Sequence, residues 1–209
     1  MGVLERVVLL ATGLVAAYLV WFFAGQHRRA GGEASHNVYY MVSFGVLLVA
    51  GLLLIGFGYG VLASPLVVIV AALIPLALAT GLVVQYFPRY GGTYLTFAVA
   101  GVLGIALTRF AGPAGLGTAV LATVHSVAGV TIFFLPLVAV RRGLTAPSFA
   151  LVTVGGTLIG IGGIALAFLK AGRPILPASF IFAILAPLLF LMTLSFALGF
   201  TRSTPAGQA

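Results

Sequence analysis

Long apolar runs that carry almost no charge constrain this chain more than any other feature. The clearest run covers residues 117–140, contains no charged side chain, and ends at Arg141 and Arg142. About 20 apolar residues in a helix span the hydrocarbon core of a bilayer. Of the 209 residues, 62% are hydrophobic and only 6% are charged, whereas a soluble domain carries about 25% charged residues. The sequence therefore predicts an integral membrane protein whose surface is covered by lipid.

Seven such runs occur, and each is expected to form a transmembrane helix within one domain. The expected spans are about 5–23, 38–62, 65–87, 94–110, 117–140, 148–169 and 175–200, followed by a short polar tail over 201–209. Pro75 and Pro187 fall inside the third and seventh spans and are expected to kink them. The fourth span is the shortest, so a six-helix alternative with a re-entrant fourth segment stays open. The predicted fold class is an all-α bundle of seven, or alternatively six, transmembrane helices.

The first three and the last three spans show a weak internal similarity. Residues 10–12 and 121–123 both read Leu-Ala-Thr, and residues 22–23 and 133–134 both read Phe-Phe at the same offset. The two internal prolines then fall in corresponding spans. This pattern predicts two parallel three-helix units joined by the fourth helix, an arrangement known in transporters. Chance similarity between apolar segments is the alternative.

The basic residues predict how the chain lies across the membrane. Seven spans place the termini on opposite sides. One side receives Arg6, Arg109, Lys170 and Arg173, and the other receives Arg28, Arg29, Arg89, Arg141, Arg142 and Arg202. The positive-inside rule then favours an external N-terminus and a cytoplasmic C-terminus in the cell (plasma) membrane. These charges are scattered between apolar runs, which argues against nucleic acid as a partner.

Two groups of glycines are candidates for close helix packing. Gly56, Gly58 and Gly60 lie in the second span, and Gly156 and Gly160 lie four residues apart in the sixth. Small residues let helices approach closely where lipid provides no hydrophobic force between them. We expect these glycines to pack within the bundle. The alternative is a face for a second copy of the chain or for another membrane subunit.

Acidic and thiol groups are nearly absent, which narrows the chemistry. The two acidic residues, Glu5 and Glu33, lie at a span end and in a loop, and the chain has no cysteine. Carriers driven by cations and proton pumps usually hold a carboxylate at membrane depth. Thiolate metal sites are excluded. His27 and His36 flank Glu33, but their spacing fits no standard zinc pattern, so no metal site is predicted there.

His125 is the one histidine inside an apolar span, and it is the single candidate for cofactor binding. Its helical neighbours Thr118, Ala122, Ala128 and Gly129 form a small, weakly polar face that we expect to point into the bundle. A structural role, with the imidazole bonded to a carbonyl or hydroxyl, is one interpretation. The other is a ligand to haem or another tetrapyrrole, or a hydrogen-bond donor to a quinone.

Three functional hypotheses follow. The first is a non-catalytic subunit of a larger energy-transducing, electron-transport membrane complex, which the missing catalytic groups and the glycine-rich faces favour. The second is a carrier or channel for a neutral or anionic solute, which the repeat, the internal prolines and the basic loops favour. The third is a membrane protein that binds haem, a pigment or a quinone through His125. No set of catalytic side chains is apparent, so an enzyme is the less favoured class.

Overall fold

Seven long α-helices form the protein in the computed structural model, which describes residues 1–113, 115–170, 172 and 174–203, with only the backbone of 167 and 170. The helices are α1 (Val3–Arg29), α2 (His36–Phe57), α3 (Pro65–Tyr86), α4 (Gly91–Ala111), α5 (Leu116–Arg141), α6 (Ala150–Lys170) and α7 (Ala178–Ser203). Three 3-10 turns accompany them: η1 (Tyr59–Ala63), η2 (Pro88–Tyr90) and η3 (Pro147–Phe149). All seven helices are long and apolar enough to cross a membrane.

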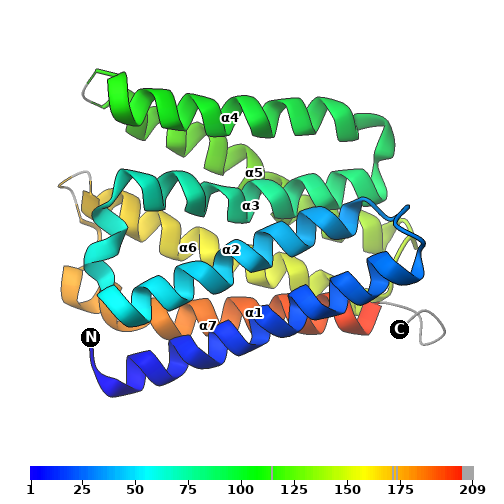
Figure 1. Ribbon diagram of the computed structural model, residues 1–209, viewed down its shortest axis with the longest axis horizontal. Helices are drawn as coiled ribbons and strands as arrows, with labels where there is room; N and C mark the ends of the chain where they lie inside the picture. The colour runs from blue at the N-terminus through cyan, green and yellow to red at the C-terminus, as the bar shows by residue number, and fades with distance from the viewer. Residues whose placement is uncertain (114, 171, 173, 204–209) are drawn as a thin grey trace.

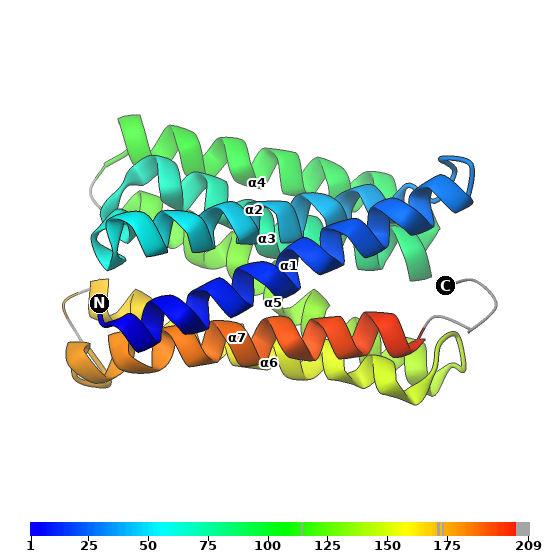
Figure 2. The same cartoon turned by 60° about the horizontal axis from the view of Figure 1, so that its bottom comes forward.

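Six of the helices form a closed ring, and the remaining helix, α4, lies outside it. Neighbours around the ring are α1, α2, α3, α5, α6 and α7, and α7 returns to α1. Among the helices, α4 packs mainly against α3 and α5, at the outer edge of the bundle (Figures 1 and 2). If α1, α2 and α3 exchange places with α5, α6 and α7 respectively, the ring contains the same pairs of neighbouring helices. The internal repeat remains a prediction, but the ring has the neighbour order that such a repeat requires.

The predicted all-α membrane bundle is confirmed, with seven helices rather than six. Helix α4 has 21 residues and runs alongside α3 for its full length (Figure 1). Two boundaries differ most from the expected spans. Helix α1 continues to Arg29, and α2 ends at Phe57 because Gly58 adopts a positive φ of 69° before η1 begins. Of the expected polar tail, residues 201–203 belong to α7 and residues 204–209 lie outside the described residues.

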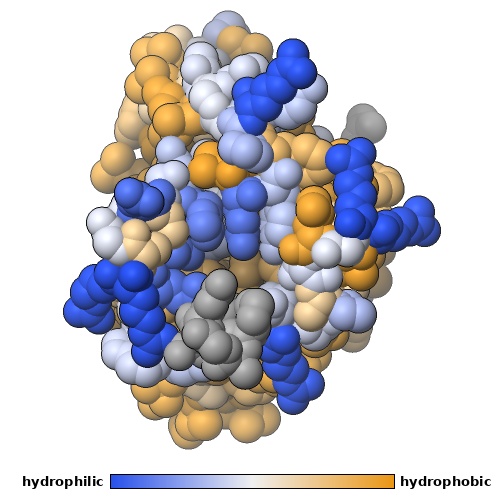
Figure 3. Space-filling view, turned by 90° about the vertical axis from the view of Figure 1, so that its right-hand side faces the viewer, coloured by the Kyte–Doolittle hydropathy of each residue, from blue (hydrophilic) through white to orange (hydrophobic). Residues whose placement is uncertain are grey.

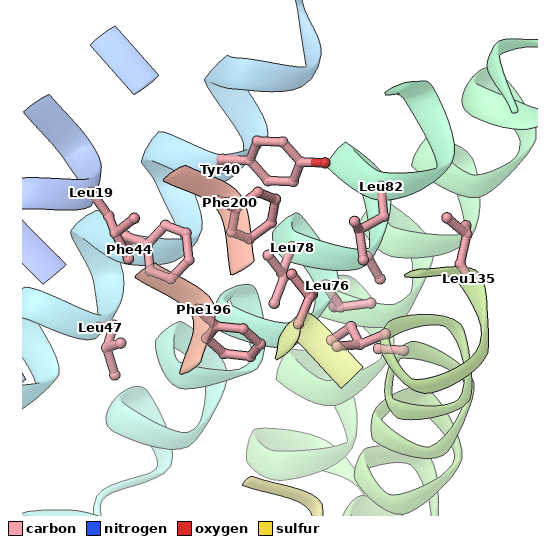
Figure 4. Packing of buried hydrophobic residues seen from close by; sticks show 14 of the residues in the cluster. Leu19, Tyr40, Phe44, Leu47, Leu76, Leu78, Leu82, Leu135, Phe196 and Phe200 are labelled. Carbon is pink, nitrogen blue, oxygen red and sulfur yellow. The ribbon is translucent and has the colours of Figure 1, made fainter. Parts of the chain in front are cut away.

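An aromatic cluster fills the ring near the end where α1 finishes. It combines Phe23 of α1, Tyr40 and Phe44 of α2, and Phe196 and Phe200 of α7. The ring centroids of Phe23 and Tyr40, and those of Tyr40 and Phe200, are 4.7 Å apart. Leucines of α3 lie beside these rings (Figure 4). Because lipid is as apolar as leucine, tight van der Waals packing of this kind is what holds the helices together.

Internal prolines occur in α3, α5 and α7, and neighbouring helices donate hydrogen bonds close to two of them. The Ser43 hydroxyl donates to the Ile74 carbonyl at 2.8 Å, next to Pro75. The Thr153 hydroxyl donates to the Phe133 carbonyl at 2.8 Å, one turn before Pro136. A proline donates no backbone hydrogen bond, so such side chains help satisfy the carbonyls around it.

The glycines that bring helices together differ largely from the expected ones. Of the predicted set, Gly156 lies against α5, where a Cβ atom would be 2.7 Å from Cγ2 of Ile132. A Cβ at Gly56, Gly58, Gly60 or Gly160 would meet no described atom within 4 Å, so these four make no close contact with another helix in the described part of the chain. Gly56, Gly58 and Gly60 lack such a contact because α2 ends at Phe57, within this group of glycines. The tight contacts lie instead at Gly81, Gly155 and Gly199.

Gly81 provides a test of this packing. A Cβ at Gly81 would be 2.5 Å from Cε1 of Tyr40, so Gly81→Ala must displace the buried ring. Overpacking of this kind costs about 1–3 kcal/mol. We expect Gly81→Ala to lower the thermal unfolding midpoint in detergent. Gly45→Ala is the matched control, because a Cβ there meets nothing within 4 Å. Equal midpoints for the two variants would contradict this account of the core.

Candidate solute-binding cavity

A polar cavity opens at one end of the bundle, directly above the aromatic cluster. This is the end at which α1, α3, α5 and α7 finish, and we call it the arginine-rich end. The cavity has a volume of about 390 Å³, which lies within the usual size range of small-molecule sites. Its walls are formed by Phe23, Gln26, Ala30, Ala34, His36, Asn37, Tyr40, Gln85, Tyr86, Leu144, Thr145, Phe149, Phe200 and Ser203.

The loop between α1 and α2 folds over the rim of this cavity. Helix α1 ends in a tight turn at Gly31 and Gly32, which both have positive φ values that suit glycine. The Nδ1 atom of His27 lies 3.1 Å from the Ala34 carbonyl oxygen, and this contact connects the two sides of the loop. Ala34 and His36 are thereby held at the cavity wall.

Carboxamide side chains are concentrated in this cavity. The chain has four such residues, Gln26, Asn37, Gln85 and Gln208. The first three line the cavity, although they come from three different helices. Gln208 lies outside the described residues. The Tyr40 hydroxyl donates a 2.6 Å hydrogen bond to Oε1 of Gln85 and so links α2 to α3 at the wall.

Asn37 is the buried polar residue that the fold itself does not explain. Among the described residues six polar side chains are buried, and five of them, Thr12, Ser43, Thr80, Thr153 and Thr193, donate hydrogen bonds to backbone carbonyls. Asn37 is only 2% exposed, and its amide forms no hydrogen bond to any side chain or backbone group among the described residues. Its amide atoms remain accessible from the cavity, because Nε of Arg109 is the one side-chain nitrogen or oxygen atom that is both fully buried and without a hydrogen bond among the described residues. Its position on the cavity wall indicates that its partner is a bound molecule or water.

The aromatic cluster closes the cavity on its inner side. Phe23, Tyr40 and Phe200 belong to both the wall and the cluster. Phe149 completes the floor, with its ring centroid 5.4 Å from that of Phe200. The cavity is therefore accessible from one end of the bundle and blocked toward the other.

Positive charge surrounds the mouth of the cavity. Arg28, Arg29, Arg89, Arg141, Arg142 and Arg202 all lie at helix termini or turns of this end. Figure 3 views this end and shows strongly hydrophilic side chains around a hollowed centre of mixed polarity. Glu33 is the one acidic residue here, since Glu5 lies in the first turn of α1 at the opposite end. A cleft with a rim of one sign of charge concentrates ions of the other sign.

His125 lies elsewhere, and its orientation differs from the expectation. It is exposed on the outer face of α5, together with Thr118, Ala122 and Gly129, and only Ala128 of the expected inward face is buried. The rotation of α5 is set by two close contacts at glycine. Val124 packs on Gly101 of α4, and Ile132 packs on Gly156 of α6. The Nδ1 atom of His125 lies 3.1 Å from the Leu121 carbonyl oxygen in its own helix.

Metal-ligating side chains do not cluster in the part of the chain that the structure describes. No group of three or more His, Cys, Asp or Glu side chains could hold a metal ion among those residues. His27 and His36 lie at the same loop, but His27 is committed to the Ala34 carbonyl. Comparisons with protein-family models, with curated proteins and with solved structures found no match to this chain.

Sequence reasoning missed the cavity because its polar residues stand singly at the ends of apolar spans. Gln85 is far from Gln26 and Asn37 in the sequence, and the three residues form no motif. One signal was available. Carboxamides are rare in this chain, and each of these three lies within a few residues of a predicted span end on the same side of the membrane. Their convergence could have been proposed from topology alone.

Cysteine labelling tests both the access and the electrostatics of the cavity. The chain has no native cysteine, so single substitutions are read without background. We expect Asn37→Cys to react with a small water-soluble methanethiosulfonate reagent. Ser43→Cys, in the same helix but fully buried at the α2–α3 contact, should not react. After correction for reaction with a free thiol, an anionic reagent should react about 10-fold faster than a cationic one. Equal corrected rates would contradict the electrostatic role of the arginines.

Proposed function

We propose that the protein is a carrier for a small anionic solute and that the cavity at the arginine-rich end is its binding site. The observation that carries this proposal is the amide of Asn37, which lies on the cavity wall and forms no hydrogen bond to another described residue. A solute that accepts or donates a hydrogen bond there would satisfy a group that the fold leaves unsatisfied. The arginines at the rim favour a negative charge on that solute.

The chemistry of the wall fits binding better than catalysis. Its polar groups are carboxamides, hydroxyls, the Tyr40 phenol and an imidazole, all of which form hydrogen bonds without requiring a fixed charge. No carboxylate lines the cavity among the described residues, and a divalent cation such as Mg²⁺ or Ca²⁺ is usually held by carboxylate oxygens, so the wall does not favour such a cation. We therefore propose that the solute is bound and released unchanged.

The helix arrangement supports transport. In carriers built from two repeats, one helical unit rocks against the other around a site between them. Here α1–α3 and α5–α7 have equivalent neighbours in the ring, and the cavity has walls from both units. The aromatic cluster would be the barrier that separates when the opposite side opens. Phe200 of α7 would then part from Phe23 and Tyr40, which belong to the other unit.

The same charges suggest an orientation. Six arginines lie at the cavity end, and the rule that short cytoplasmic loops are richer in Lys and Arg favours that end in the cytoplasm. We propose that the protein lies in the cell (plasma) membrane with its N-terminus outside and its cavity open to the cytoplasm.

Uptake into proteoliposomes tests the proposal. We expect saturable uptake of at least one of three radiolabelled probes, inorganic phosphate, lactate and benzoate. Asn37→Leu should reduce that uptake about 10- to 100-fold, because a hydrogen bond to a charged group contributes about 1.5–3 kcal/mol. The unfolding midpoint should change little, since no protein hydrogen bond of the Asn37 side chain is lost.

Adjacent tyrosines provide a matched control for this experiment. Tyr40→Phe removes the hydroxyl that bonds Gln85 at the cavity wall, whereas Tyr39→Phe removes a hydroxyl that does not line the cavity. We expect slower uptake in the first variant and unchanged uptake in the second. Wild-type uptake no faster than leakage from protein-free liposomes, or equal uptake by Asn37→Leu and wild type, would contradict the carrier proposal.

The outer face of α5 favours a second candidate, a subunit of a larger membrane complex. His125 is exposed about 14 Å along α5 from its start, at a rise of 1.5 Å per residue, with Ser126 and Gly129 beside it. An ionisable group that faces lipid at this depth is unfavourable and usually has a partner. We propose that another membrane subunit covers this face. A haem or other tetrapyrrole ligated by His125 would lie at that boundary rather than inside the bundle.

Photo-crosslinking in native membranes distinguishes this candidate. A photoreactive amino acid at Ser126 should give an adduct with another protein. The same amino acid at Val99, which is also exposed, on α4, should give none. A visible absorption band that disappears in His125→Ala would show that the neighbour is held with a tetrapyrrole. Adducts of equal yield from both positions would argue against a specific subunit contact.

A further inference from the structure

A second hollow lies on the side of the bundle, between α3, α4 and α5, and it is almost entirely apolar. It has a volume of about 500 Å³ and is lined mainly by valine and aromatic side chains, among them Phe87, Tyr90, Phe97, Val130 and Phe134. Val130 is 57% exposed and Phe134 is 56% exposed, so the groove opens sideways into the lipid. We call it the α4–α5 groove.

Two of the polar side chains on the wall of this groove, those of Tyr94 and Thr131, form hydrogen bonds within the protein. The Tyr94 hydroxyl donates to Oγ1 of Thr131 at 3.2 Å, and the Thr131 hydroxyl donates to the Val127 carbonyl at 2.9 Å. The groove therefore offers an apolar surface to whatever fills it. An apolar chain suits this surface better than a polar solute does.

The length of the groove matches one leaflet of a bilayer. Its lining residues on α5 extend from Val127 to Val138. Eleven residues of helix correspond to about 16 Å at 1.5 Å per residue. Half of the roughly 30 Å hydrocarbon core is about 15 Å. A single acyl chain of one leaflet would therefore lie along the groove from end to end.

Two arginines stand at the end of the groove that faces the membrane surface. The guanidinium carbon of Arg142 lies 5.3 Å from the ring centroid of Phe87, and that of Arg89 lies 6.0 Å from the ring centroid of Tyr90. Both rings line the groove. The two cations are thus held on its aromatic mouth at the arginine-rich end of the bundle. Basic pockets at such positions between transmembrane helices bind anionic lipid headgroups.

We propose that the α4–α5 groove binds one anionic phospholipid of the leaflet at the arginine-rich end. Its acyl chain lies against α4 and α5, and its phosphate-containing headgroup pairs with Arg89 and Arg142. The apolar wall selects a lipid over a soluble anion, and the two arginines select an anionic lipid over a zwitterionic one. The site is separate from the polar cavity, so it does not depend on the carrier proposal.

Native mass spectrometry of the detergent-purified full chain tests this site. The probes are phosphatidylglycerol and phosphatidylcholine with identical acyl chains, and the measurement is the apparent Kd of the first bound lipid. Phosphatidylglycerol should bind more tightly. The double variant Arg89→Gln/Arg142→Gln should weaken its binding about 30-fold, from the typical contribution of each arginine near a membrane surface.

Two matched controls separate the site from general surface charge and from misfolding. Arg28→Gln/Arg29→Gln removes the same charge at the same end but away from the groove, and it should weaken binding less than 3-fold. Val130→Trp fills the groove and leaves both arginines, so it should also weaken binding, whereas Val99→Trp on the outer face of α4 should not. Each variant is measured only as a monodisperse species in size-exclusion chromatography.

The outcomes decide the proposal. Equal affinity for the two lipids, or equal loss in the two arginine pairs, would overturn the headgroup assignment. Unchanged affinity in Val130→Trp would overturn the acyl-chain assignment. Tight binding of inorganic phosphate that competes with phosphatidylglycerol would show that the arginines recognise a free anion rather than a lipid.

Discussion

The contact between the Tyr40 ring and the backbone of Gly81 joins the aromatic core to the end cavity. A Cβ at position 81 would lie 2.5 Å from the ring, so the close approach of α2 and α3 depends on glycine there. The same ring packs against Phe23 and Phe200, and its hydroxyl reaches Gln85 on the cavity wall. One side chain therefore sets the spacing of two helices, closes the floor of the cavity and orients a wall residue. Because lipid supplies no hydrophobic force between helices, such contacts determine the arrangement.

Buried polar groups in this protein differ in whether the fold itself provides their hydrogen-bond partners. Hydroxyls inside the bundle donate to backbone carbonyls, either within their own helix or, for Ser43 and Thr153, across to a neighbour near a proline. They are satisfied by the fold and need no ligand. The Asn37 amide is different, because its surroundings leave it open to the cavity. In an interior where unsatisfied polar groups are costly, that difference is what points to a binding site.

Helix α5 has three distinct surfaces, and each suits a different neighbour. Val124, Ala128 and Ile132 face the core, where glycines of α4 and α6 admit them closely. Its side toward α4 forms the apolar groove beneath Arg142. Its outer face presents His125. The proposed lipid and subunit contacts therefore lie on different faces of this helix, and the proposed solute cavity lies at the arginine-rich end of the bundle.

The amino-acid sequence alone determined that lipid surrounds this protein and that it has six or seven membrane helices. Seven apolar runs cannot be buried in water, and each is long enough to cross a bilayer, so composition and length suffice for that conclusion. The single charges between the runs also place six arginines at one end. These inferences need no knowledge of which helices touch, because they depend on each segment's own transfer between water and lipid.

Only the tertiary structure decided which side chains meet. His125 was expected inside the bundle, but a helix in lipid has no polar side that must face outward, so sequence periodicity does not reveal its orientation. The glycines that matter were set by neighbours such as Tyr40 and Ile132 rather than by spacing along the chain. The carboxamides of Gln26, Asn37 and Gln85 converge because three helix ends meet at one cavity. Contacts between helices depend on shape complementarity over short distances, and that information appears only when the helices are packed.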